Sequence, residues 1–143
     1  MDYNNDEIAA CASGIFENEL GGRICAMGYH PFSEATYYWR ALQMKKLFVW
    51  LSKNTLPSYV VSHYRLFHVA HKTEEKQLIT IFNPTNEPFK KVEIAVNTEK
   101  NTAEIYTQKQ AEIPYKADVC GGDVYRKMVV EEILPYEMVL IEV

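Results

Sequence analysis

The sequence lacks several features that would assign it to a class at once. Its first ten residues, MDYNNDEIAA, contain neither the basic nor the apolar segment of a signal peptide, and no apolar run approaches the length of a membrane span. Basic residues are not in excess, because 15 Lys and Arg are set against 19 Asp and Glu, for a net charge of -4. We therefore expect a soluble chain with no nucleic-acid and no membrane partner, whose compartment stays open.

Cysteines are few and show no regular spacing. Cys11, Cys25 and Cys120 cannot all pair with one another and form no CxxC motif, so we interpret them as free thiols. No internal repeat or low-complexity tract is present. What remains is an ordinary globular composition, 48% apolar and 24% charged, in a length of 143 residues that suits one domain with an attached fragment.

The first third of the chain predicts a strand followed by one long helix. The apolar run ICAM between Gly22 and Gly28 favours a short strand, over residues 23–29, that is covered on both faces. Ser33 is placed to cap a helix that runs to about Lys53, with apolar residues at helical spacing around a broad face. Such a helix needs cover on more than one side.

After Pro57 the sequence changes to short apolar runs separated by polar turns. We predict strands over residues 59–71, 77–83, 89–96, 102–108, 124–133 and 137–143, and a long connection over 109–123. The fold class is therefore α+β: mainly an antiparallel β-sandwich of about six strands or more, preceded by one long amphipathic helix and a short strand. We divide the chain into residues 1–57 and 58–143.

Four segments in this order resemble the C-terminal end of multidomain β-galactosidase-like glycoside hydrolases: ELGGRICAMGYHPF, YYWRALQMKKLFVWLSKNTLP, QLITIFNPTNEPFKKVEI and ILPYEMVLIEV. In that family an amidotransferase-like α/β domain follows the catalytic barrel, and a small β-sandwich closes the chain. The resemblance implies that residues 1–57 are the end of the α/β domain and that residues 58–143 are the terminal sandwich. It is compatible with a periplasmic or secreted parent protein.

The family's catalytic carboxylates lie on the barrel, and no segment of this sequence matches it. The resemblance therefore implies a non-catalytic accessory region of a carbohydrate-active enzyme, with a structural or assembly role and sugar contact as a secondary task. The alternative is a stand-alone β-sandwich that binds a glycan or a protein. We expect the partner to be the rest of a larger polypeptide, or a second copy bound through the helix of residues 33–53.

Chemical candidates among the residues are few, and we expect no catalytic, cofactor or metal site. His63 and His71 on one extended strand would stand about 27 Å apart, too far to share an ion. Adjacent carboxylates such as Glu131 and Glu132 point to opposite faces of a strand, which does not suit a glycosidase pair. Cys25 and His30 could be proposed as a nucleophile and its base, but neither has a recognisable partner to orient it or lies at a nucleophile elbow.

Aromatic side chains give the sharpest binding hypothesis, because sugar rings stack on exposed aromatic faces. The candidate sugar-contacting residues are Tyr106, Tyr115, Tyr125 and Tyr136, all in the sandwich part of the chain. Their alternative role is packing at the core and its rim, with the hydroxyl group reaching water. Trp39 and Trp50 are predicted to anchor the helix.

Overall fold

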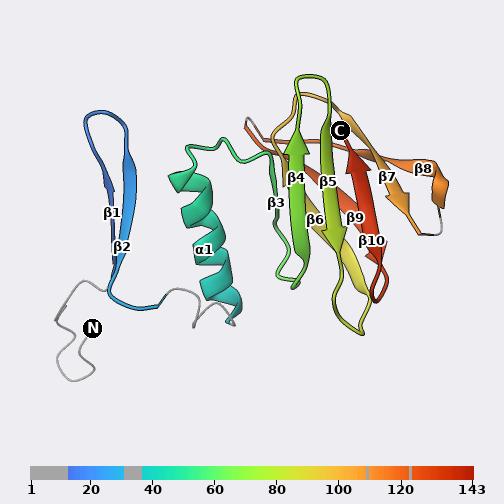
Figure 1. Ribbon diagram of the computed structural model, residues 1–143, viewed down its shortest axis with the longest axis horizontal. Helices are drawn as coiled ribbons and strands as arrows, with labels where there is room; N and C mark the ends of the chain where they lie inside the picture. Colours follow the sequence, from blue (N-terminus) through green and yellow to red (C-terminus); the bar gives the residue numbers. More distant parts are fainter. Residues whose placement is uncertain (1–12, 31–36, 109, 123) are drawn as a thin grey trace. The chain divides into compact units, whose positions relative to one another are not determined.

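The computed structural model describes residues 13–30, 37–108, 110–122 and 124–143. The chain forms two compact units, residues 1–54 and residues 55–143, which are described separately. The first holds a hairpin and the helix, and the second holds the sandwich (Figure 1). Among the described residues, no helix is long and apolar enough to cross a membrane.

The hairpin of the first unit pairs β1 (Ser13–Glu17) with β2 (Arg23–Met27) in antiparallel fashion. Its turn uses the predicted glycine pair: Gly21 has a φ of 77°, and the Gly22 N–H donates to Asn18 Oδ1 at 2.7 Å. The prediction that this strand is covered on both faces is not met in the described residues, since Ile24 is 63% exposed. A two-stranded hairpin leaves one face open unless another element packs on it.

Helix α1 (Tyr38–Leu51) begins later than predicted and ends close to the expected place. The proposed cap, Ser33, lies outside the described residues, and Tyr37 occupies the N-cap position without a side-chain hydrogen bond. At the other end Asn54 adopts a φ of 61° and donates its N–H to the Val49 carbonyl, which terminates the helix. Trp39 is 56% exposed, so it is not the buried anchor that we expected.

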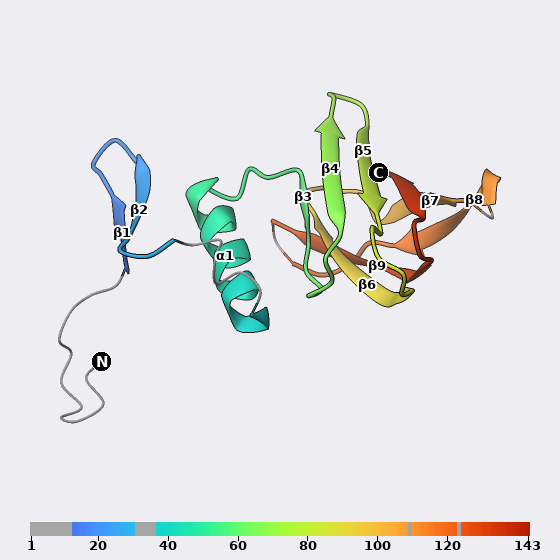
Figure 2. The same ribbon diagram turned by 60° about the horizontal axis from the view of Figure 1, so that its bottom comes forward.

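The second unit is a sandwich of two antiparallel sheets, which confirms the predicted fold class (Figure 2). The smaller sheet has the order β3-β6-β9, with β3 (Ser58–Val60), β6 (Phe89–Val96) and β9 (Arg126–Ile133). The larger has the order β4-β5-β10-β7-β8, with β4 (Phe67–Lys72), β5 (Gln77–Phe82), β7 (Thr102–Thr107), β8 (Gln110–Asp118) and β10 (Met138–Glu142).

The core lies between the two sheets and follows from the alternation of side chains along each strand. Ile79 and Ile81 on β5, Ile141 on β10 and Ile94 on β6 are all fully buried. Further core residues come from both sheets: Val92, Val96, Ala103, Ile105, Met128, Val130 and Val139. Along β5, Gln77, Ile79 and Ile81 are buried, whereas Leu78, Thr80 and Phe82 lie on the opposite face.

The segment predicted as one strand over residues 59–71 is two strands in two different sheets. β3 ends at Val60 and β4 begins at Phe67, so the chain crosses from the smaller sheet to the larger between them. The crossing is fixed by specific bonds: Ser62 Oγ accepts the Glu93 N–H at 2.7 Å, and the Tyr64 ring stacks on Phe89. These contacts replace the turn residues that the sequence does not provide.

The segment predicted as a connection over residues 109–123 contains the nine-residue strand β8. Pro114 is tolerated there because β8 is an edge strand, where a proline need not interrupt the ladder. The irregular part is limited to the end, where Gly121 and Gly122 both have a φ of 72°. A Cβ atom on Gly122 would stand 2.0 Å from the Tyr125 carbonyl oxygen, so only glycine fits.

Two predicted turns are joined by buried polar side chains. Asn83 follows β5, and its amide nitrogen donates to the carbonyls of Glu87 (2.8 Å) and Leu134 (3.0 Å). Glu137 precedes β10, and its carboxylate accepts the backbone N–H groups of Leu134 (2.7 Å) and Gln108 (3.1 Å). The two residues are buried and close the core at this end of the sandwich.

Candidate interaction surface on the five-stranded sheet

The outer face of the larger sheet carries a continuous apolar area. The register places Phe67 of β4, Phe82 of β5 and Met138 of β10 in one cross-strand row. The next row is Val69, Thr80 and Leu140. We call Phe67, Val69, Phe82, Met138 and Leu140 the apolar outer surface.

Phe67, Val69, Met138 and Leu140 are exposed although they are apolar, and Phe82 is half-buried. Phe67 is 65%, Val69 66% and Met138 57% accessible to solvent. The rings of Phe67 and Phe82 lie nearly parallel, with an interplanar angle of 21° and centroids 6.3 Å apart. Isolated exposed apolar residues are common, but a contiguous group on one sheet face marks a binding surface.

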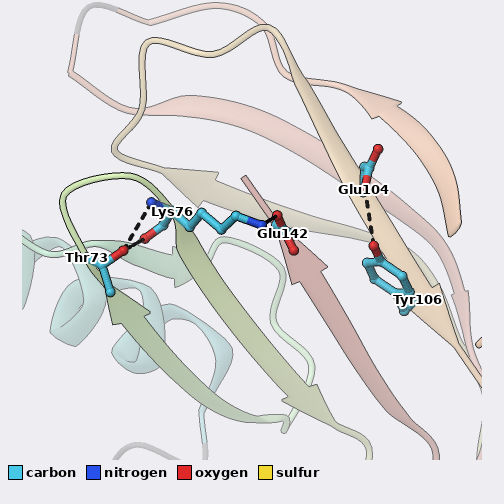
Figure 3. Close-up of polar contacts among 5 residues, drawn as sticks. All are labelled: Thr73, Lys76, Glu104, Tyr106 and Glu142. Atoms are coloured by element: carbon cyan, nitrogen blue, oxygen red, sulfur yellow. Dashed lines mark hydrogen bonds and ion pairs between the residues drawn. The ribbon is translucent and has the colours of Figure 1, made fainter.

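Polar and charged groups lie on the same sheet beside the apolar outer surface: Lys76 precedes β5, Glu142 is on β10, and Glu104 and Tyr106 are on β7. Figure 3 shows the contacts among these groups. Lys76 Nζ donates to Glu142 Oε1 at 2.6 Å, and Tyr106 Oη donates to Glu104 Oε2 at 3.2 Å. The hydrogen bond to Glu142 and its negative charge raise the pKa of Lys76 above its usual value. Partial burial and the Glu104 carboxylate likewise raise the pKa of the Tyr106 hydroxyl. Lys76 and Glu142 therefore carry opposite charges, whereas the partner of Glu104 is a neutral hydroxyl group.

The four predicted tyrosines lie in four different surroundings. Tyr106 is on the outer face of the larger sheet, because its neighbour Ile105 points into the core. Tyr115 pairs with Ile105 and packs against the core from the inner face. Burial raises the pKa of its hydroxyl group, an effect that a hydrogen bond with the Glu131 backbone opposes.

The other two tyrosines lie outside the strands. Tyr125 precedes β9 and meets the Tyr59 ring edge to face, with centroids 5.1 Å apart. Tyr136 lies in the turn between β9 and β10 with a φ of 57°, and its hydroxyl donates to Asn86 Oδ1. The structure therefore does not assemble the four rings into one platform.

The histidines are also separated. His63 packs beside Tyr64 in the crossing segment, and His71 lies on the outer face of β4, opposite Leu78. His68 points inward, and its Nε2 lies 2.9 Å from Ser58 Oγ. Across the described ranges, no group of three or more His, Cys, Asp or Glu residues is placed to hold a metal ion.

The sandwich unit has hollows on its surface, and two of them have the following lining residues. One, of about 550 Å³, lies at the loop end and is lined mainly by residues 72–77 and 97–100, with charged side chains of both signs. The other, of about 450 Å³, lies between the edge strands β8 and β9, where Tyr115, Met128 and Lys127 contribute to its wall. Both are open, and the wall of the second also includes Cys120 and Glu131.

Comparison with family models, curated proteins and solved structures gives no match for this chain. Function must therefore be argued from the surface that the strands create. The sequence did carry a signal for that surface: the runs LITIF and MVLI are apolar at outward as well as inward positions. The sequence alone does not show that these outward residues lie side by side, because it does not reveal which strands flank β10.

Proposed function

We propose that this chain is a non-catalytic accessory region of a carbohydrate-active enzyme, and that the apolar outer surface binds a folded domain of that enzyme. The observation that carries the proposal is the contiguous exposure of Phe67, Val69 and Met138 on one sheet face. Burying such side chains contributes roughly 25 cal/mol for each Å² removed from water. A folded partner therefore gains stability by covering them.

The chemistry of the surface favours a protein partner over a sugar. Sugar sites combine an aromatic face with polar groups that bind the hydroxyls, whereas the neighbours of the Phe67 and Phe82 rings are Val69 and Met138. Apolar residues beside a charged border are the arrangement found in protein interfaces. The three strands that carry these residues, at about 4.8 Å spacing and each about five residues long, present roughly 250 Å² in projection. A standard protein interface buries about 800 Å² on each partner, so on this proposal the contact extends beyond the apolar outer surface.

The resemblance described above supplies the class of enzyme. In glycoside hydrolases of that type the terminal sandwich follows the catalytic and α/β domains, and the sandwich fold of residues 55–143 is consistent with such a place. On this proposal the second unit holds or orients the catalytic portion. Any sugar contact at Tyr106, Tyr115, Tyr125 or Tyr136 is secondary.

A photo-crosslinking experiment in the source cells tests the proposal. A benzophenone amino acid replaces Phe67 in one variant, and replaces Val129 in a control variant. Val129 is also exposed, but it lies on the outer face of the smaller sheet. We expect crosslinked peptides from a glycoside hydrolase catalytic or α/β domain with the first variant and at least about tenfold fewer with the second.

Other products would overturn the proposal. Crosslinks from position 67 to a second copy of the chain would identify a homo-oligomer. Crosslinks to proteins unrelated to carbohydrate chemistry, or equal yields at positions 67 and 129, would remove the accessory role. Binding of oligosaccharides to the purified chain, lost in the Phe67→Ala variant, would favour the stand-alone glycan-binding alternative.

A further inference from the structure

Strand β4 has a different role on each of its faces. Phe67 and Val69 point outward and form part of the apolar outer surface, while His68 between them points into the sandwich. Its Nε2 lies 2.9 Å from the hydroxyl of Ser58, which is buried on β3. β3 and β4 are edge strands of different sheets, so this hydrogen bond joins the two sheets at their shared edge.

The surroundings of His68 offer no charge to balance a protonated imidazole. The inward-facing residues of the neighbouring strands are uncharged: Ser58 and Val60 on β3, Ile79 and Ile81 on β5, and Ile94 and Val96 on β6. Tyr59 lies between the inward-facing Ser58 and Val60 and therefore points outward, whereas Tyr64 packs against the core and its hydroxyl donates to the Lys90 carbonyl. The other titratable side chains of these strands and of the crossing segment are exposed: His63, Arg65, His71, Lys72, Lys90, Lys91 and Glu93. Burial lowers the pKa of His68, because the charged ring is poorly solvated there.

We propose that His68 is an acid sensor for the apolar outer surface: its protonation opens the joint between β3 and β4 and displaces the strand that carries Phe67 and Val69. The effect on a bound partner rests on the proposed function, whereas the opening of β4 does not. An edge strand is suited to this movement, because it is held by a ladder on one side. Water then solvates the charged ring, and binding at Phe67 and Val69 weakens.

The direction of the pH effect follows from the direction of the shift. The closed form favours the neutral ring, whereas an opened ring has an ordinary pKa of about 6.5. The closed joint is therefore fully stabilised above about pH 6.5. That stabilisation is lost as the pH falls from there toward the lowered pKa, and no further loss occurs below it.

Amide hydrogen exchange of the full chain at pH 7.5 and pH 5.0 tests the opening directly. Rates are expressed as protection factors, which removes the pH dependence of intrinsic exchange. We expect protection of residues 68–72 to fall severalfold at pH 5.0 relative to residues 139–141 of β10. The Val69 methyl resonances should shift with the same midpoint as the His68 imidazole, and that midpoint should lie below 6.5.

Variants separate His68 from other acid effects. His68→Gln keeps a group that can bond to Ser58 but cannot ionise, so protection of β4 should not change between the two pH values. His71→Gln, on the outer face of the same strand, should retain the wild-type response. Ser58→Ala removes the bond but keeps the histidine, so β4 should already be less protected at pH 7.5.

Several results would overturn the inference. Equal β4 protection at both pH values in the wild type, a His68 midpoint at or above 6.5, or an unchanged acid response in His68→Gln would each do so. The crosslinking yield from position 67, measured at both pH values, separates this inference from the proposed function. A yield that is high at pH 7.5 and unchanged at pH 5.0 refutes the sensor alone, whereas acid opening of β4 without any enzyme crosslink refutes the accessory role alone.

Discussion

The two faces of the larger sheet are built from the same strands, but one face is buried and the other is largely exposed. On β10, Val139 and Ile141 are fully buried, while Met138 and Leu140 between them are exposed. On β5, Ile79 and Ile81 are buried, while Leu78 beside them is exposed. Strands with apolar residues at successive positions are typical of sheets covered on both faces. These strands therefore have the composition of a sheet covered on both faces, and the sandwich itself covers one of them.

The polar residues follow the same division. On the inner face, Asn83 and Glu137 continue the rows of buried residues and are held by several hydrogen bonds each. On the outer face, Lys76 and Glu142 form an ion pair that water can reach. The inner polar groups therefore contribute to folding, whereas the outer ones lie on the same face as the apolar outer surface.

The largest expected effect on stability comes from comparing alanine substitutions at two neighbouring residues of β10. Ile141→Ala should lower the free energy of unfolding by about 2–5 kcal/mol, because it leaves a cavity between the sheets. Leu140→Ala, one residue away, should change it by less than about 1 kcal/mol. Urea denaturation measures both. Equal losses would show that the outer face is already covered in the isolated chain.

A smaller loss is expected at the polar end of the inner face. Asn83→Ala removes the donor to the Leu134 and Glu87 carbonyls, and also the acceptor Oδ1 for the Thr85 N–H. We expect a loss of about 1–3 kcal/mol, read as a lower melting temperature. Asn86→Ala in the same turn is the control and should cost less, since Asn86 is exposed. A reversed order would mean that the buried amide does not hold the two turns together.

Much of the sandwich could be predicted from alternation alone. The strands over 77–83 and 89–96 were found because apolar side chains alternate between defined polar turns. The prediction of a single strand over 59–71 is wrong, because the residues SHYR at 62–65 include no glycine or proline that would indicate the end of a strand. The crossing there depends on Glu93 and Phe89, which lie far away in the sequence.

The candidate surface could not be predicted in the same way. It exists because β10 inserts between β5 and β7, which brings Met138 beside Phe82 across more than fifty residues of sequence. The prediction of the four tyrosines rests on residue type alone, whereas the sheet face on which each ring lies depends on the strand register. Tyr106 and Tyr115, for example, point to opposite sides of the sheet.

The smallest expected effect concerns the border of the outer face. Because Glu142 raises the pKa of Lys76, the pair stabilises the fold fully below the usual lysine value of 10.5, and the contribution is lost as the pH rises through the raised value. Glu142→Gln should lower the Lys76 pKa toward 10.5, as measured by NMR of the ammonium group. Solvent and salt screen an exposed pair, so the free energy of unfolding at neutral pH should change little.

Glu132→Gln is the matched control, because Glu132 and Lys90 face each other on the smaller sheet with their charged atoms 3.9 Å apart. A loss in Glu142→Gln as large as that in Asn83→Ala would contradict the division between a folding face and a binding face, because it would place the ion pair within the folding core.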